Sequence, residues 1–116
     1  MKYQFATVPA GATVQVYFYG NWGTDFRAFI DRIGYGPKCM PWEDLWFYWY
    51  IDGELIERYN YQIAEVKKPH WLVEPYIARN EILWQVVNNS AVQHICEVLC
   101  DGVLVMKPEA KVRYGV

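Results

Sequence analysis

Hydrophobic and polar positions alternate along most of this chain, which is the pattern of β-strands with one buried face. Every second residue is apolar from Val14 to Phe18, and again from Ile82 to Val86. β-Branched and aromatic residues dominate these stretches. The alternation predicts a protein built almost entirely from strands.

Turn-forming residues separate these stretches at regular intervals. Two Asp-Gly pairs, Asp52-Gly53 and Asp101-Gly102, lie between apolar runs and predict two-residue hairpin turns. Gly34-Tyr35-Gly36-Pro37 predicts a loop. Residues 26–33 also fit a short helix after Thr24-Asp25, but their alternation favours a strand. The expected strands cover about 3–8, 12–19, 26–33, 45–52, 54–60, 71–77, 81–88, 93–100, 103–107 and 110–114.

Eight to ten short strands with regular turns predict an all-β fold, an antiparallel β-sandwich of jelly-roll type. The stretch 81–90, followed by Asp101-Gly102, is similar to many antiparallel sandwich modules, a resemblance of fold alone. Neither composition nor low complexity divides the chain. With 116 residues, we expect one domain over 1–116.

Composition and charge narrow the function classes. A hydrophobic share of 53% excludes an intrinsically disordered chain. The net charge of −2 and scattered basic residues argue against a nucleic-acid partner. No apolar run approaches the roughly 18 residues of a membrane span, and the N-terminus lacks the apolar core of a signal peptide. We therefore expect no membrane partner, and a location in the cytoplasm or in a virion.

The three cysteines are Cys39, Cys96 and Cys100, an odd number that argues against a disulfide framework. On one straight strand, Cys96 and Cys100 would lie roughly 13 Å apart at a rise of about 3.3 Å per residue. A disulfide requires Cα atoms within about 7 Å. We therefore expect reduced, buried thiols.

The aromatic share of 18% is high for so small a domain, and it concentrates at residues 42–50. On a strand, Leu45, Phe47, Trp49 and Ile51 share one face. The opposite face carries Trp46, Tyr48 and Tyr50. Both faces are apolar, so the strand is either covered on both sides or presents an aromatic strip to a subunit or a sugar.

Further aromatic residues fall in expected loops or beside them: Trp22, Tyr35, Trp42 and Trp71. They could close the ends of a sandwich, or they could contact a ligand. Nearby acids and amides, such as Asp25, Glu43 and Asn21, would suit a carbohydrate-binding module. The sequence does not fix how these side chains lie relative to one another.

Support for catalysis or a metal site is weak. His94 and Cys96 are two apart and would point the same way, and His70 could join them, as in a metal-dependent cupin-like enzyme. The chain has only two histidines, no His-x-His and no Cys-x2-Cys, and it lacks a phosphate loop and a nucleophile elbow. We expect no enzyme activity and no cofactor.

The leading functional hypothesis is a non-catalytic structural or assembly module that forms a homo-oligomer through aromatic surfaces. A phage or viral virion component, such as a capsid accessory or decoration protein, is its concrete form. The alternatives are a carbohydrate-binding module that uses Trp22, Trp42 and Trp46, with a glycan as partner, and a cupin-like metal enzyme.

Overall fold

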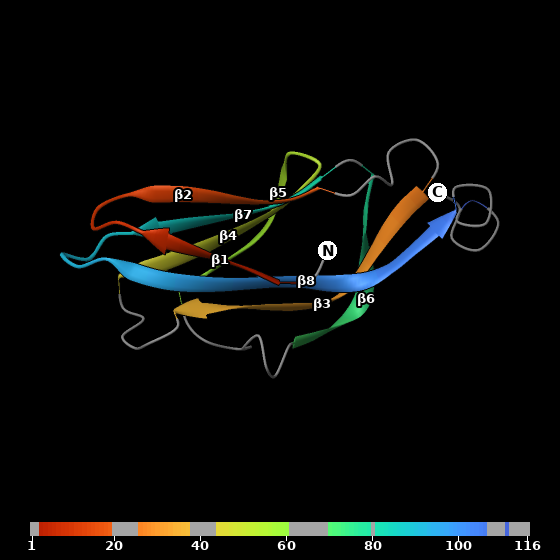
Figure 1. Ribbon diagram of the computed structural model, residues 1–116. Coiled ribbons are helices and arrows are strands. Elements are labelled where there is room, and N and C mark those ends of the chain that lie inside the picture. Colours follow the sequence, from red (N-terminus) through yellow and green to blue (C-terminus); the bar gives the residue numbers. More distant parts are fainter. Residues whose placement is uncertain are drawn as a thin grey trace.

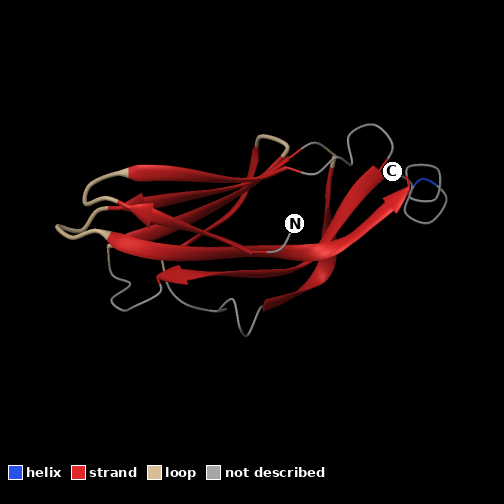
Figure 2. Cartoon of the chain, viewed as in Figure 1, coloured by secondary structure: helices blue, strands red, loops and turns tan. Residues whose placement is uncertain are grey.

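The computed structural model describes residues 3–19, 26–37, 44–60, 70–79, 81–106 and 111. Nearly all of this part is strand (Figure 2). Its eight strands are β1 (Tyr3–Val8), β2 (Thr13–Tyr19), β3 (Phe26–Pro37), β4 (Leu45–Ile51), β5 (Glu54–Tyr59), β6 (His70–Ala78), β7 (Glu81–Asn88) and β8 (His94–Met106). For His70 and Trp71 only the place in β6 is described.

Two four-stranded antiparallel sheets form the fold (Figure 1). One sheet, called sheet A below, has the strand order β1-β8-β3-β6, and sheet B has the order β2-β7-β4-β5. First and last strands pair, then second with seventh, third with sixth and fourth with fifth. Nested pairing of this kind, divided between two packed sheets, is the jelly roll. The expected fold class is therefore confirmed.

Two connections between described strands follow local turn chemistry. Asp52 and Gly53 have φ values of 50° and 84°, as a type I′ turn between β4 and β5 requires. The turn from β1 to β2 contains Gly11 at φ 72° and is closed by the Ala12 N–H, which donates to the Pro9 carbonyl at 3.0 Å. The expected turn at Asp52-Gly53 is confirmed, as is the preference for a strand over a helix at residues 26–33.

Two expectations about turns are wrong. Asp101-Gly102 lies inside one continuous strand, β8, where we expected two strands, 93–100 and 103–107. Gly34-Tyr35-Gly36-Pro37 belongs to β3, which extends four residues beyond the expected end at 33. In the described part of the chain, positive φ among the glycines is confined to Gly11 and Gly53. Gly34, Gly36 and Gly102 therefore lie within strands and do not form the turns that their sequence neighbours suggest.

Gly102 allows two strands to approach closely. The register between β3 and β8 shifts between Ile30 and Arg32, which marks a β-bulge. A Cβ atom at position 102 would lie 1.7 Å from the backbone oxygen of Phe29. The glycine is thus required by contact with β3 and not by a turn.

The core lies between the sheets and is rich in aromatic rings. Trp84 lies at its centre, stacked against Trp49 at a centroid distance of 6.0 Å and tilted against Tyr35 at 5.4 Å. Tyr35 also stacks on Tyr59 at 4.5 Å. Aromatic pairs of this kind contribute about 0.5–1.5 kcal/mol each beyond the area they bury. Much of the high aromatic content is therefore core packing.

One end of the sandwich is held by a buried amide. Asn88, the last residue of β7, is fully buried and donates through Nδ2 to the carbonyls of Val8 at 3.0 Å and Val92 at 2.9 Å. Its Oδ1 accepts the Ser90 N–H at 2.9 Å. One side chain thus joins the end of β1 to the loop before β8, which keeps the two sheets in register at this end.

Candidate functional site: the outer face of sheet B

The aromatic strip expected on residues 45–51 lies where the alternation places it. Burial alternates strictly along β4, with Leu45, Phe47, Trp49 and Ile51 in the core. Trp46, Tyr48 and Tyr50 point to the outer side of sheet B and are half-buried. The rings of Trp46 and Tyr48 stack on each other at 6.2 Å with an angle of 28° between their planes.

Neighbouring strands extend this strip into a face three rows deep. The Tyr50 row continues through Leu83 of β7 to Tyr17 of β2, and on the other side to Leu55 of β5. The Trp46 row continues through Val87 to Thr13. These are the same-face partners that strand register brings together. The two outer rows therefore carry apolar, aromatic and hydroxyl side chains without a charge among the described residues.

The middle row is polar and fixed by hydrogen bonds. It runs from Arg58 through Tyr48 and Gln85 to Gln15. Gln85 accepts the Tyr50 hydroxyl at 3.3 Å, and Gln15 accepts the Tyr17 hydroxyl at 2.9 Å. Both glutamines are thus oriented by tyrosines of the next row, which leaves their amide N–H₂ groups directed away from those hydroxyls. Arg58, at the edge, is the one charged residue of these rows in the described part of the chain.

The other aromatic residues proposed from the sequence as contact residues do not lie on this face in the described part of the chain. Tyr35 is 1% exposed and belongs to the core, so its interpretation as a loop contact is wrong. The glycines on either side of it are strand residues, which is why the loop prediction failed. Trp71 lies in β6 opposite Arg32 of β3. Trp22 and Trp42 lie outside the described residues, as does the expected strand 110–114 apart from Lys111.

The cysteines of β8 are sealed in the core. Cys96 and Cys100 are buried and free, as expected, and Cys39 lies outside the described residues. Burial raises the pKa of each of the two thiols to about 12. Cys100 Sγ also accepts the indole N–H of Trp84 at 3.1 Å. Neutral thiols in this setting are packing groups, because metal binding and nucleophilic attack require the thiolate.

The geometry gives little support to a metal site at His94, Cys96 and His70. His94 and Cys96 alternate onto the same side of β8, as the spacing predicts, but Cys96 is enclosed while His94 is half-exposed at the strand's start. His70 is placed in β6 opposite Ile33 of β3. No group of three His, Cys, Asp or Glu side chains within the described ranges could hold a metal ion.

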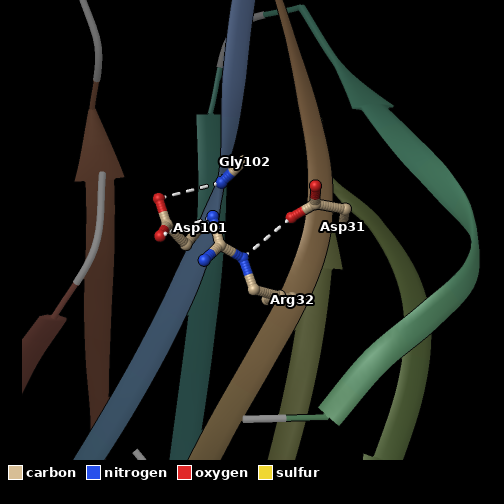
Figure 3. A network of polar contacts seen from close by, with 4 residues as sticks. All are labelled: Asp31, Arg32, Asp101 and Gly102. Carbon is tan, nitrogen blue, oxygen red and sulfur yellow. Dashed lines mark hydrogen bonds and ion pairs between the residues drawn. The ribbon is translucent and has the colours of Figure 1, made fainter.

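A polar cluster on the opposite sheet has a structural explanation. Arg32 of β3 forms ion pairs with its neighbour Asp31 at 3.1 Å and with Asp101 of β8 at 2.9 Å (Figure 3). Asp101 Oδ1 also accepts the Gly102 N–H at 2.9 Å. The cluster lies at the bulge and joins the two strands where their register shifts, so both carboxylates face the same cation.

Sequence reasoning missed two parts of the surface. The first is the contribution of β7 and β2 to the outer face of sheet B, which the alternation at 81–87 could have placed beside β4. The second is β1, whose Tyr3 and Phe5 are 44% and 64% exposed. Alternation predicts their shared face but not which strand forms an edge, because edges depend on the pairing order.

Comparison with known proteins adds no identification to this geometry. No protein-family model matches the chain, and no curated protein matches it. In the part of the chain that the structure describes, no helix is long and apolar enough to cross a membrane. The fold class is therefore what defines this protein: a jelly-roll β-sandwich with an aromatic outer face.

Proposed function

We propose that this chain is a non-catalytic assembly module that forms a homo-oligomer through the outer face of sheet B. The observation that carries the proposal is the half-exposed strip of Trp46, Tyr48 and Tyr50, continued by apolar residues on β7. An antiparallel sheet normally presents polar side chains on its solvent side. An apolar, aromatic outer face is typical of a surface that contacts another protein.

The chemistry of the face fits a second copy of the same sheet. Tyrosine and tryptophan contribute contact area at small cost in conformational entropy, and their polar ends can remain hydrated at the rim. The two outer rows carry no like charges that would repel when the face meets itself. Leu83 and Val87 offer aliphatic surface against which rings of the second copy can pack.

A carbohydrate ligand is the competing occupant. Sugars stack on the open face of an aromatic ring, and oriented amides such as those of Gln15 and Gln85 suit their hydroxyls. The rings of Trp46 and Tyr48, however, are stacked partly on each other, which reduces the open ring face. The aliphatic neighbours on β7 also suit a protein surface better than a polar sugar.

A virion component is the concrete role we propose for such a module. Jelly rolls form viral capsid proteins as well as lectin domains and cupins, so the fold permits this role without demanding it. Support comes from the combination of a small sandwich, buried inert thiols and a self-complementary aromatic face.

The test is the mass in solution of a Tyr48→Arg variant. Tyr48 lies on the outer side, so an arginine there should leave the core intact while placing a charge at the centre of the contact. We expect light scattering to show a smaller assembly than the wild type. The matched control is Val92→Arg, in an exposed loop at 58% exposure, which should leave the mass unchanged.

Two outcomes would overturn the proposal. One is a Tyr48→Arg variant that has the mass of the wild type at every concentration. The other is a saturable change in tryptophan fluorescence with a glycan panel that Trp46→Ala abolishes, which would assign the same face to sugar binding.

A further inference from the structure

A second surface lies on the other sheet, at the free edge of β1. This strand pairs with β8 on one side and is the first strand in the order of sheet A. Four of its six residues are exposed, including Gln4, whose position alternates toward the core. No backbone hydrogen bond of the described residues joins β1 to any strand other than β8. Among the described residues, this edge therefore has no backbone partner.

Two other edges of the sandwich, those of β5 and β6, are protected against strand pairing. β5 carries Glu54, Glu57 and Arg58, and its register with β4 shifts at a bulge. β6 contains a glutamate and Pro75, and its register with β3 is interrupted. Charges, bulges and prolines are the devices by which edge strands avoid pairing with other chains.

β1 and β2 lack these devices, since neither contains a charged residue or a proline. They differ in one respect. The Gln4 amide donates to the Tyr17 carbonyl of β2 at 2.7 Å, so a side chain of β1 already occupies part of the β2 edge. The edge of β1 has no comparable cover in the described part of the chain.

We propose that β1 pairs antiparallel with β1 of a second copy, about a two-fold axis at Phe5. In that register Phe5 faces Phe5 of the second copy, and Tyr3 faces Thr7, all on the outer side of sheet A. Gln4 faces Ala6 on the inner side. Residues that face each other across an antiparallel pair lie on the same side of the sheet, and this register satisfies that condition throughout.

Charge favours the strand's own copy as the occupant. Among the residues that the structure describes, the nearest charge on the outer side is Glu97, which lies opposite Phe5 on β8. In the proposed pairing the two Glu97 side chains are separated by three strand spacings, roughly 14 Å. That separation exceeds the screening length of about 8 Å at physiological ionic strength. Over Tyr3–Val8 a neutral edge thus meets a neutral edge, with aromatic rings at the centre.

This inference does not rest on the contact through sheet B, because the two surfaces belong to different sheets. Together they give each chain two self-complementary surfaces. Two such surfaces build an assembly larger than a dimer, either a closed tetramer or an open chain of copies.

The first experiment compares Phe5→Lys with its matched control Ile95→Lys. Ile95 is exposed on the same face of sheet A, but it lies on β8, one strand away from the edge. Phe5→Lys places two lysines opposite each other on the axis, and we expect it to weaken the β1 contact about tenfold or more. Ile95→Lys should leave the mass near that of the wild type.

Combining Phe5→Lys with Tyr48→Arg separates the two proposals by light scattering. We expect each single variant to form a dimer through its remaining surface and the double variant to be a monomer. A Phe5→Lys variant with the mass of the wild type would overturn the β1 pairing alone. A Tyr48→Arg variant with the mass of the wild type would overturn the sheet B contact alone.

The second experiment tests the register directly. In a Cys39→Ser background, Phe5→Cys should form a disulfide-linked dimer under mild oxidation, since facing Cβ atoms lie about 4.5–5.5 Å apart. Ile95→Cys in the same background should remain unlinked. If Phe5→Cys stays monomeric under oxidation, or if both variants link equally, the proposed pairing is wrong.

Discussion

At the scale of single residues, one glycine and a few side chains determine how the strands pack in the sandwich. Gly102 permits β8 to approach the bulge of β3, and Arg32 fixes that region by pairing with Asp101. The thiol of Cys100 satisfies the indole N–H of Trp84 in the core. None of these roles is visible in the sequence, because each depends on a partner distant along the chain.

The first prediction concerns Gly102. Gly102→Ala places a methyl group against the backbone oxygen of Phe29, which cannot move without displacing β3. We expect a loss of about 3 kcal/mol or more in the free energy of unfolding, measured by denaturant titration.

Gly53→Ala is the matched control. It has free space around its Cβ position, although its φ of 84° disfavours a side chain. It should cost only about 1–2 kcal/mol. Equal losses in the two variants would contradict the role assigned to Gly102.

The second prediction concerns the pH dependence of stability. Burial raises the pKa of Cys96 from the usual 9.0 to about 12, so the native state keeps a proton that the unfolded chain releases. The stabilisation from the neutral thiol is therefore complete below pH 9 and is lost as the pH rises toward 12. We expect the urea midpoint to fall between pH 9 and pH 11.

Cys96→Val isolates this effect, because it retains the packing volume and removes the titrating group. Its midpoint should fall less steeply over the same range than that of the wild type. Parallel curves for the two proteins would show that Cys96 does not contribute.

At the scale of elements, two segments that share an Asp-Gly pair followed two residues later by Leu show what local sequence can and cannot decide. Tyr50-Ile51-Asp52-Gly53-Glu54-Leu55 forms a hairpin turn, and Leu99-Cys100-Asp101-Gly102-Val103-Leu104 continues as a strand. β3 is long enough to pair with β8 on both sides of Gly102. Pairing along that length, with the Arg32–Asp101 ion pair, overrides the local preference for a turn.

The alternation of burial along β4 was predictable, because it depends on the local sequence alone. The strand at Asp101-Gly102 was not, because it depends on pairing with a distant segment. Which side of β4 faces the core follows from a period of two, since Leu45, Phe47, Trp49 and Ile51 are the stronger apolar set. The class of fold and the two faces of β4 could therefore be derived from sequence. The strand order, and with it the free edge at β1, arises from pairing between distant segments.

The third prediction concerns the turn between β4 and β5. Both carboxylate oxygens of Asp52 accept backbone N–H groups, from Arg79 at 2.8 Å and from Glu81 at 3.0 Å. Asp52→Ala removes both acceptors and puts a side chain with no local hydrogen bond at positive φ. We expect a loss of about 1–3 kcal/mol in the free energy of unfolding.

Glu54→Ala, an exposed substitution two residues away, is the control and should be close to neutral. In the Asp52→Ala variant, we expect faster amide hydrogen exchange at Arg79 and Glu81, which would show that the loss of stability comes from these two hydrogen bonds. Unchanged exchange at both amides would contradict the proposed link between the turn and the start of β7.

At the scale of the whole molecule, most aromatic side chains that the structure describes fall into two parts. One part, centred on Trp84, fills the core between the sheets. The other part lies outside, as the strip of β4 on sheet B and as Tyr3 and Phe5 on β1 of sheet A. The two outer groups lie on different sheets, which fits the two contacts between copies that we propose.

The most direct test of this account is the mass of the unaltered protein in solution, measured by light scattering over micromolar concentrations. The account predicts an assembly larger than a dimer, which dissociates toward dimers on dilution. A monodisperse monomer throughout that range would contradict it, because both outer groups of aromatic residues would then lack the partner that we assign to them.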